Sequence, residues 1–389
     1  MSLCDREMSI FNFKPKTKHR SIVGVVCEHN RLSITWFSGG EVRKYVCVDV
    51  GENIVRGSDI LLPGSFSSLL RSTLKENDIK CKYAAYALPG EKVFTRNIKM
   101  PRMADEQVRL NIPFEFRDFI SGELKDYVFD YSYIRNGAGV DDSGEPVVKV
   151  FAAALPKGFL SDTIAMFSAA GLRLVKAAPE LSSYEALLSL LPTEEEQAKE
   201  RCFLDIGRNH TRMLIYKNHH YKLMYMIDIG ENTIIRNIAH EKNVDMHIAA
   251  AYLRSKFEDC DKLPAAIAAY KDISLEVLKS LNFYEISDMS ARLEDLTICG
   301  EGAQIKPLVD LLKTRIAMNV TTIDELFPKW DRDGLMALAA PSLGMVLDTG
   351  KSSINFIGAG ETHTNWKYAV PYIAAVLIAA APLSEFPIV

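Results

Sequence analysis

Residues 203–216 read FLDIGRNHTRMLIY, in which an Asp-Ile-Gly turn separates two apolar runs. Asp205 can orient a metal-bound water, Gly207 leaves backbone N–H groups accessible, and Thr211 adds a hydroxyl. Such a turn could bind the phosphates of a nucleotide together with their magnesium ion. A plain β-turn between two core strands is the alternative, and the stretch by itself is compatible with both.

The same pattern occurs twice, because residues 24–53 align with residues 203–232 without a gap. Each segment contains three apolar runs separated by polar turns and ends in DVGEN or DIGEN. This pattern predicts two three-stranded antiparallel meanders, with hairpin turns at SGGE and KNHH. A helical stretch follows each meander, so the sequence predicts two related α/β halves.

Between the two halves, the sequence alternates strand and helix periodicity in the order β-α-β-β-α-β. That order predicts a small inserted α+β subdomain. The predicted divisions are a first half (20–90), the insert (91–176), a helix and linker closing the first half (177–200), a second half (201–350), a linker (351–367) and an apolar tail (368–389).

Composition excludes several classes of function. The 389 residues are 48% hydrophobic and 25% charged, which is ordinary for a globular chain long enough for two domains. The formal net charge of −4, with no basic tract, gives no reason to expect a nucleic-acid partner. The seven cysteines include no Cys-x-x-Cys pair, so we expect reduced thiols and neither a disulfide framework nor a zinc site.

The order of elements and several motifs resemble the PilM family, the FtsA-like members of the actin-like ATPase superfamily in type IV pilus assembly. The resemblance is carried by ALPGEKVFTRNIKMPRMADEQVRLNIPFEF, DYVFDY, AAGLRLVKAAPELSSYEALL, DIGRNHT, DIGENT and CGEGAQIKPL, and it extends over residues 20–350. It implies an actin-like (ribonuclease H-like) α/β fold, duplicated into two domains, with an inserted small α+β subdomain.

In this family two phosphate loops, one from each half, hold ATP and magnesium, and a late glycine turn contacts the adenosine. Carried over to this sequence, the resemblance makes Asp205 the metal ligand. The cofactor-binding positions that it implies are Asn30, Asp205, Gly207, Asn209, Thr211, Gly230, Arg254, Gly300, Gly302 and Lys306.

The first phosphate loop departs from the family pattern, because GVVCEHN stands where the family has roughly Gly-Ile-Asp-Ile-Gly-Ser-Ser. The internal repeat agrees, since it places Val26 opposite Asp205 and Glu28 opposite Gly207. Valine cannot orient a metal-bound water, and a glutamate adds a side chain and a negative charge beside the phosphate path. We therefore expect binding of ATP and Mg²⁺ to be weak or lost, and we assign no catalytic residue.

The tail extends the resemblance to a partner. In these pilus systems the membrane protein PilN begins with a short cytoplasmic peptide similar to Ile-Asn-Leu-Leu-Pro, followed at once by a membrane helix. Ile354, Asn355, Phe356 and Ile357 resemble that peptide, and the uncharged run 368–383 stands in place of the helix. We predict that the chain carries the start of its own PilN-like partner as a fusion, and an unrelated apolar tail is the alternative. The run is shorter than the roughly 20 residues of a spanning helix, so a membrane segment and a buried terminal helix both remain open.

Taken together, the sequence predicts a scaffold at the cytoplasmic face of the inner membrane in type IV pilus assembly. Its expected partners are a PilN-like membrane protein, other pilus assembly proteins and, through the insert, neighbouring copies of itself. A slow ATPase is the alternative, and it needs Glu28 to replace the acid missing at Val26. A sugar or acetate kinase of the same superfamily would need an intact first loop and a catalytic aspartate, and the sequence offers neither.

Overall fold

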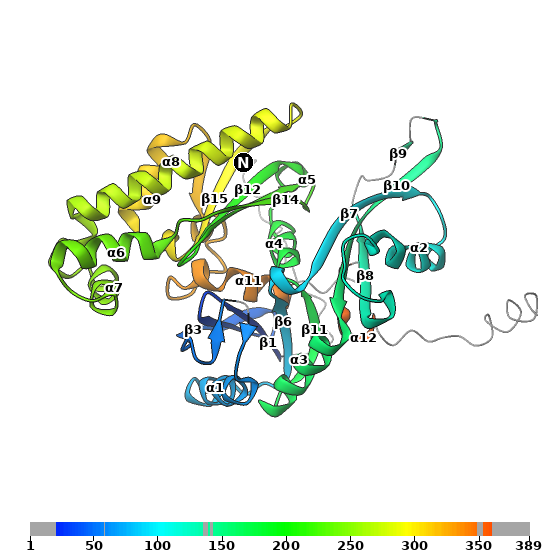
Figure 1. Cartoon of the computed structure of the whole chain (residues 1–389), viewed down its shortest axis with the longest axis horizontal. Coiled ribbons are helices and arrows are strands. Elements are labelled where there is room, and N and C mark those ends of the chain that lie inside the picture. The colour runs from blue at the N-terminus through cyan, green and yellow to red at the C-terminus, as the bar shows by residue number, and fades with distance from the viewer. Residues whose placement is uncertain (1–20, 58, 135–138, 141–142, 348–352, 360–389) are drawn as a thin grey trace, which may run out of the picture.

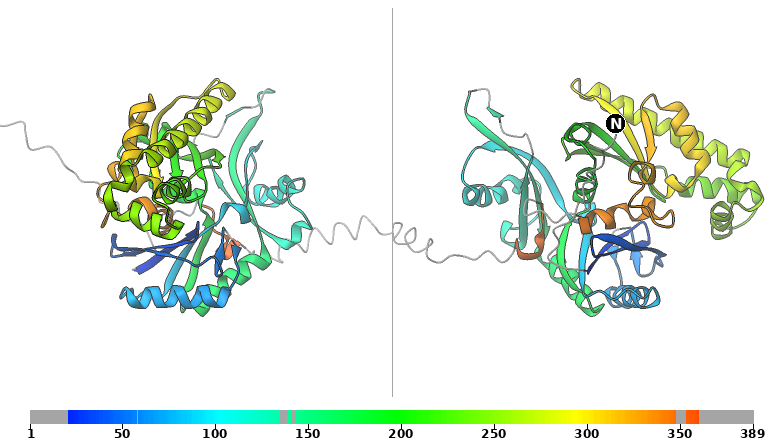
Figure 2. Two further views of the ribbon diagram at one scale, coloured as in Figure 1. Left: turned by 60° about the vertical axis from the view of Figure 1, so that its left-hand side comes forward. Right: turned by 180° about the vertical axis from the view of Figure 1, so that it is seen from behind.

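In the part of the chain that it describes, the computed structural model contains two five-stranded sheets, a smaller third sheet and a two-stranded ribbon (Figure 1). Each five-stranded sheet belongs to one of two similar halves, and the smaller sheet lies to one side of them. Figure 2 shows the same three bodies from two other directions. The residues that the structure describes are 21–57, 59–134, 139–140, 143–347 and 353–359.

The first half is built on a sheet with the strand order β11-β6-β1-β2-β3. Its first three strands form an antiparallel meander, and β6 and β11 extend the sheet in parallel with β1. Helices cover both faces of this sheet, so β1 and β6 are apolar along most of their length. The strands are β1 (Ser21–Glu28), β2 (Arg31–Ser38), β3 (Glu41–Asp49), β6 (Tyr83–Leu88) and β11 (Arg173–Pro179), and the ribbon is β4 (Val55–Arg56) with β5 (Asp59–Ile60).

The second half repeats this plan with the strand order β14-β13-β12-β15-β16. An antiparallel meander again occupies one side, and two parallel strands occupy the other. Both predicted meanders and both predicted hairpin turns are thereby confirmed. The strands are β12 (Glu200–Ile206), β13 (Thr211–Lys217), β14 (His220–Ile227), β15 (Leu293–Gly300) and β16 (Asn319–Thr322).

Helices cover the outer face of each sheet and connect its strands (Figure 1). On the first sheet, α1 and α3 lie side by side, and on the second sheet α6, α8 and α9 enclose a separate apolar core. Apart from α2 of the insert, the described α-helices outside the middle layer are α1 (Pro63–Glu76), α3 (Lys157–Ala169), α5 (Glu194–Ala198), α6 (Glu231–Lys242), α7 (Met246–Ser255), α8 (Pro264–Ser287), α9 (Lys306–Arg315), α10 (Ile323–Leu326) and α12 (Phe356–Ala359).

Two helices, α4 (Leu181–Leu188) and α11 (Met336–Leu347), form a middle layer between the two sheets. They pack against each other, and α11 contacts β1, β2 and β6 of the first sheet as well as β15 of the second. Tyr184 of α4 packs on Phe203 of β12 with ring centroids 4.8 Å apart. One apolar core therefore continues across the boundary between the halves.

Close backbone contacts fix α11 in the middle layer. A Cβ atom at Gly24 of β1 would lie 1.9 Å from the carbonyl oxygen of Ser342, and one at Gly344 would lie 2.1 Å from the carbonyl oxygen of Ser183. The hydroxyls of Thr35 and Ser342 lie 2.6 Å apart in the same contact, where both side chains are buried. Because a side chain at either glycine would displace backbone, the layer depends on these two residues.

The inserted subdomain has a sheet with the order β7-β10-β8, to which the short β9 adds by pairing with β10. Helix α2 packs on this sheet, and Val108, Ile112 and Phe116 fill a small core of its own. The elements are β7 (Phe94–Pro101), α2 (Asp105–Asn111), β8 (Tyr127–Tyr133), β9 (Gly139–Val140) and β10 (Pro146–Pro156).

Two of the predicted boundaries need correction. The pattern over 91–176 assigned six elements to the insert, but β11 pairs with β6 in the first sheet and α3 packs against α1. Parallel strands need a crossover, and α3 supplies the one that leads to β11, so the insert lies within that crossover. The predicted second half, 201–350, also contains α11, whose apolar side chains pack on the first sheet.

Within the described ranges, no helix combines the length and the apolar composition required to cross a membrane. The predicted tail segment 368–389, with its uncharged run 368–383, lies outside the residues that the structure describes.

The contact between β1 and α11 predicts that Gly24→Ala destabilises the protein. The added methyl group would overlap the backbone at Ser342, which cannot move without disturbing the middle layer, so we expect a loss of about 1–3 kcal/mol in the free energy of unfolding. Gly64→Ala is the matched control, because a Cβ atom there would meet open space. Urea unfolding measures both variants, and equal stability of the two would contradict the proposed packing.

Candidate functional site

Two hairpins, one from each meander, meet at the boundary between the halves, and they differ in length. His29 and Asn30 alone join β1 to β2, and both are in the left-handed region, with φ of 49° and 60°, as a type I′ turn requires. The four residues 207–210 join β12 to β13. The first hairpin is therefore a closed tight turn, whereas the second retains a longer loop.

The start of α6 holds the longer loop in place. The backbone N–H of Glu231 donates to the carbonyl of Gly207 at 2.9 Å, and that of Asn232 donates to the carbonyl of Arg208 at 2.8 Å. A Cβ atom at Gly230 would lie 2.4 Å from the Gly207 carbonyl oxygen, so this approach needs glycine. The first amides of α6, which are the groups that bind phosphate at a helix N-terminus, are thus bonded to protein carbonyls.

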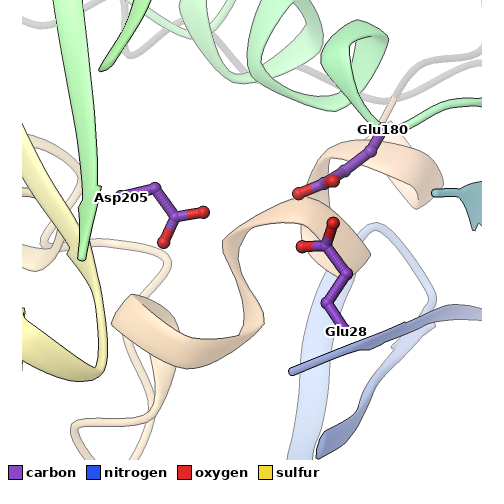
Figure 3. A group of neighbouring side chains, drawn as sticks. All are labelled: Glu28, Glu180 and Asp205. Atoms are coloured by element: carbon purple, nitrogen blue, oxygen red, sulfur yellow. The ribbon is translucent and has the colours of Figure 1, made fainter. Parts of the chain in front are cut away.

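Three carboxylates converge beside these hairpins. Glu28 ends β1, Glu180 follows β11 and Asp205 lies in β12, and one oxygen atom from each lies within 4.8 Å of the others (Figure 3). The side chain of Arg212 lies among them, because Arg212 on β13 is directly opposite Asp205 in the antiparallel ladder. We call these four residues the Arg212 cluster.

Arg212 donates to all three carboxylates. Its two Nη atoms donate to Glu28 at 2.8 Å each and to Glu180 at 2.8 and 2.9 Å, and its Nε donates to Asp205 at 3.2 Å. The side chains of Arg212 and Glu180 are only 8% and 2% exposed. Bidentate contacts of this kind suit the planar guanidinium, and here they connect strands of the two halves.

Burial determines the electrostatics of the cluster. It raises the pKa of Glu180 well above its ordinary value, with Arg212 opposing the shift and Glu28 adding to it. Burial also lowers the pKa of the neighbouring His29, and the charge of Arg212 lowers it further. The folded protein therefore holds a proton at Glu180 at pH values where the unfolded chain has released it.

The Arg212 cluster does not fit a magnesium ion that bridges phosphates. Carboxylates are suitable ligands, but the guanidinium of Arg212 already lies among them and pairs with each. The adjoining cavity, lined by residues that include His29, Asp205 and Gly300, has a volume of about 40 Å³, which is room for a water molecule or two. A larger cavity of about 330 Å³ also borders Glu28, Glu180 and Arg212, so it is the guanidinium, and not the available volume, that keeps Mg²⁺ from the carboxylates.

Further ion pairs cross the boundary away from the cluster. Arg31 Nη1 of the first half lies 3.1 Å from Glu301 Oε1 of the second half. Asp49 of the first half pairs with Arg208 and, at 3.4 Å, with Arg254. Glu301 is 8% exposed and Asp49 is 53% exposed, so the pairs of Asp49 are the more weakly stabilising ones.

Three of the cavities among the described residues lie along this boundary. The central one, of about 40 Å³, contains Asp205; the second, of about 100 Å³, contains Arg254 and Lys306; and the third, of about 330 Å³, contains Asn30 and Asn209. The second and third share no lining residue. The central cavity, however, shares Glu28 and His29 with the third and Arg31 and Glu301 with the second. The predicted nucleotide ligands therefore line adjoining cavities, and of these three only the last reaches the roughly 300 Å³ typical of a ligand pocket.

The remaining predicted ligands contribute to packing. The hydroxyl of Thr211 is buried and donates to the carbonyl of Ile229 at 2.7 Å, so it does not face the space between the halves. Gly302 packs closely on the side chain of Ile206, and Gly300 lies against the carboxylate of Asp205.

Arg212 and Glu180, the two residues that complete the cluster, are not among the predicted site residues. A signal for Arg212 exists, because it is a charged residue one position into the otherwise apolar strand TRMLIYK, and a buried arginine must be paired. Glu180 likewise follows an apolar strand end and precedes the buried helix α4. Only the fold, however, brings both of them to Glu28.

A second candidate site binds the chain's own residues 353–359. Ile354 and Phe356 are each 1% exposed and join the main core beside β8 and β11. Between them, the side-chain oxygen of Asn355 accepts the N–H of Ala177 at 3.0 Å, and its amide nitrogen donates to the carbonyl of Val175 at 3.2 Å. Because β11 is an edge strand, the amide of Asn355 bonds it as a neighbouring strand would. We call this surface between β8 and β11 the tail groove.

Asp130 on β8 completes the tail groove. Its Oδ2 accepts the backbone N–H of Asn355 at 2.7 Å. Burial raises the pKa of Asp130, while this hydrogen bond opposes the shift. The groove continues into a cavity of about 180 Å³, whose lining includes Arg109, Lys157 and Ala359.

Comparison with known proteins places this geometry in context. A family model described as type IV pilus assembly protein PilM matches residues 38–332. No curated protein sequence matches the chain. The solved structure of a PilM-PilN type IV pilus biogenesis complex is similar at 18% identity and a TM-score of 0.67, covering 84% of this chain and 97% of that one.

The ethanolamine utilization protein EutJ from Carboxydothermus hydrogenoformans is similar at 12% identity and a TM-score of 0.53, covering 85% of this chain and 90% of that one. At these identities the likenesses establish the fold alone. The predicted actin-like fold is thereby confirmed.

The raised pKa of Glu180 predicts how stability depends on pH. The folded state keeps a proton that the unfolded chain loses, so the contribution of Glu180 to stability falls as the pH rises above the ordinary carboxyl value. Glutamine cannot titrate. When the pH is raised from about 5 to about 8, we therefore expect the free energy of unfolding to fall less in Glu180→Gln than in the wild type. Urea unfolding at both pH values measures this, with the exposed Glu76→Gln as the control that keeps the wild-type slope. A steeper loss in Glu180→Gln would contradict the assignment.

Proposed function

The chain belongs to the PilM family of type IV pilus assembly proteins, and from this premise we propose that it is a scaffold that binds a PilN-like membrane protein and uses no nucleotide. The tail groove carries the first part of the proposal, and the Arg212 cluster carries the second. A protein of this kind needs a stable body and a selective peptide-binding surface, and it needs no catalytic residue.

Selectivity of the tail groove supports the partner assignment. The groove buries two apolar anchors, Ile354 and Phe356, and meets both ends of the Asn355 amide with backbone groups of β11. The backbone N–H of Ile357 also donates to the Asn355 side chain at 3.1 Å, which closes the segment into a turn. Such a surface recognises a short apolar-Asn-apolar segment, the pattern expected of a PilN-like peptide. The solved relative is itself a complex of a PilM with a PilN.

In this chain, the segment that occupies the groove is the chain's own, as in a fusion of the scaffold with the start of its partner. The segment begins a few residues after α11, so its effective concentration at the groove is high. A separate PilN-like peptide would have to compete with it. This competition would make the tail a built-in occupant and regulator of partner binding.

The proposed location is the cytoplasmic face of the inner membrane. The membrane partner would hold the scaffold there, and insertion of the run 368–383 would add an anchor. Other pilus assembly proteins and further copies of the chain would bind the inserted subdomain, where Leu110, Phe114 and Phe119 are 70%, 57% and 55% exposed. Apolar side chains exposed to this extent are suited to protein contacts.

The alternative function is a slow ATPase of the actin-like type. It would need Arg212 to leave the carboxylates so that Mg²⁺ and phosphates could enter, and Glu28 to act where Val26 stands. The longer second hairpin, with Asp205 beside it, is the observation in its favour. The ion pairs that Arg212 already makes with all three carboxylates weigh against it.

Removal of residues 352–389 should open the tail groove. We expect the truncated protein to bind an added INFIG peptide, and the full-length protein to bind it at least about tenfold more weakly, because its own segment competes. Replacing the peptide's asparagine by alanine should weaken binding about 10–100-fold, since the backbone groups of Val175 and Ala177 lose their partner. Fluorescence anisotropy measures all three affinities. If the truncated protein has no affinity for INFIG, the groove is not a peptide site.

A thermal-shift titration with Mg-ATP separates the scaffold from the ATPase. We expect the unfolding midpoint to change by less than about 1 °C in both the wild type and Asp205→Ala, because Arg212 already fills the site. A large rise in the wild type that Asp205→Ala abolishes would instead establish a working nucleotide site.

A further inference from the structure

The Arg212 cluster joins residues that belong to different halves. Glu28 and Glu180 extend from strands of the first sheet, whereas Asp205 and Arg212 lie on neighbouring strands of the second. All the contacts of Arg212 with the two glutamates therefore cross the boundary. The carboxylates point toward one shared space, as Figure 3 shows without the arginine.

The carboxylates would suit a divalent cation if the arginine were absent. One oxygen from each of Glu28, Glu180 and Asp205 lies within 4.8 Å of the other two, which is the spacing of ligands around a single ion. With Arg212 present, the same carboxylates are satisfied by two bidentate contacts at 2.8–2.9 Å and a further contact to Asp205. A cation of the chain itself thus stands where an external cation would otherwise bind.

We propose that the guanidinium of Arg212 is a built-in cation that fastens the two halves together in place of a bound divalent metal, and that the three carboxylates are a latent metal site which Arg212 covers. The proposal rests on the proposed function only in that a scaffold without nucleotide must close its two halves by itself. Among the polar contacts that join the halves, it assigns the closure chiefly to one side chain, beside the apolar core that crosses the same boundary.

The other arginine ion pairs between the halves are weaker candidates for this role. The pairs that Asp49 makes with Arg208 and Arg254 lie at the surface, where screening reduces their strength. Arg31 and Glu301 form a single contact at 3.1 Å, whereas Arg212 contacts three carboxylates. Buried charges that lose their partner are strongly destabilising, so removal of Arg212 should lower the stability of the whole protein.

The test uses full-length Arg212→Ala and two measurements, the midpoint of thermal unfolding and the radius of gyration from small-angle X-ray scattering. Without metal, we expect the midpoint to fall by roughly 5–10 °C and the radius of gyration to increase, because the buried acidic groups then lose the cation that joins them across the boundary. Millimolar Mn²⁺ or Mg²⁺ should reverse at least half of both changes by entering the uncovered site. Neither ion should change either measurement for the wild type.

Arg201→Ala is the matched control, because Arg201 is another buried arginine, 2% exposed. It pairs with Glu196 of α5 and Asp295 of β15 at 3.3 and 3.0 Å, and neither of these lies on a strand of the first sheet. We expect its removal to lower the unfolding midpoint as well, but with no recovery in Mn²⁺ and no change in the radius of gyration.

Three outcomes would overturn the proposal. The first is a loss of stability in Arg212→Ala that neither Mn²⁺ nor Mg²⁺ reverses. The second is an unchanged radius of gyration in that variant, and the third is a metal-induced rise in the wild-type midpoint. If Arg212→Ala fails to fold, Arg212→Lys keeps the charge and should retain the wild-type radius of gyration with a lower midpoint, and an expanded Arg212→Lys would count against a built-in cation. If the wild type binds Mg-ATP, the proposed scaffold function is contradicted. If divalent ions fail to rescue Arg212→Ala and the wild type does not bind Mg-ATP, only the present inference is contradicted.

Discussion

A guanidinium remains buried at low free-energy cost only while every carboxylate around it stays within hydrogen-bonding distance. For Arg212 those carboxylates come from both sheets, so this one requirement sets the separation of β1 from β13. The tight turn at His29 and Asn30 is consistent with it, since Glu28 must end its strand beside β13. The middle layer of α4 and α11 must fit into the same space between the sheets. It does so through close backbone contacts at Gly24 and Gly344, where a side chain would not fit.

The two halves share a plan and differ where they face each other. Both meanders have the same strand order and the same second hairpin length, yet the first hairpin is closed in one half and longer in the other. The aligned positions explain the difference, because Arg212 corresponds to Ser33 and Gly207 corresponds to Glu28. Glu28 of the first half and Arg212 of the second half thus pair across the boundary. If both halves had the same longer loop, a ligand could bind between the two loops at this place.

Local patterns in the sequence were sufficient for the meanders, for the hairpin turns and for the duplication, because each depends on neighbouring residues and on a repeat. Local patterns could not show that β11 belongs to the first sheet, because the whole insert separates β11 from its partner strand β6 in the sequence. The same limit applied to the site. Asp205 stands out by its Asp-Ile-Gly turn, but nothing local indicates that Glu180 and Arg212 meet it, because their contacts join distant parts of the chain.

The insert lies within the crossover between β6 and β11, and this placement has a mechanical consequence. One wall of the tail groove is β8 of the insert, and the other is the edge strand β11 of the first sheet. A segment bound in the groove therefore contacts both the insert and the first half. Tension on that segment would load the Asn355 hydrogen bonds to β11 and, through β11, the first sheet and its middle layer. Force applied at the groove would therefore reach the junction of the two halves through the strand that ends next to Glu180.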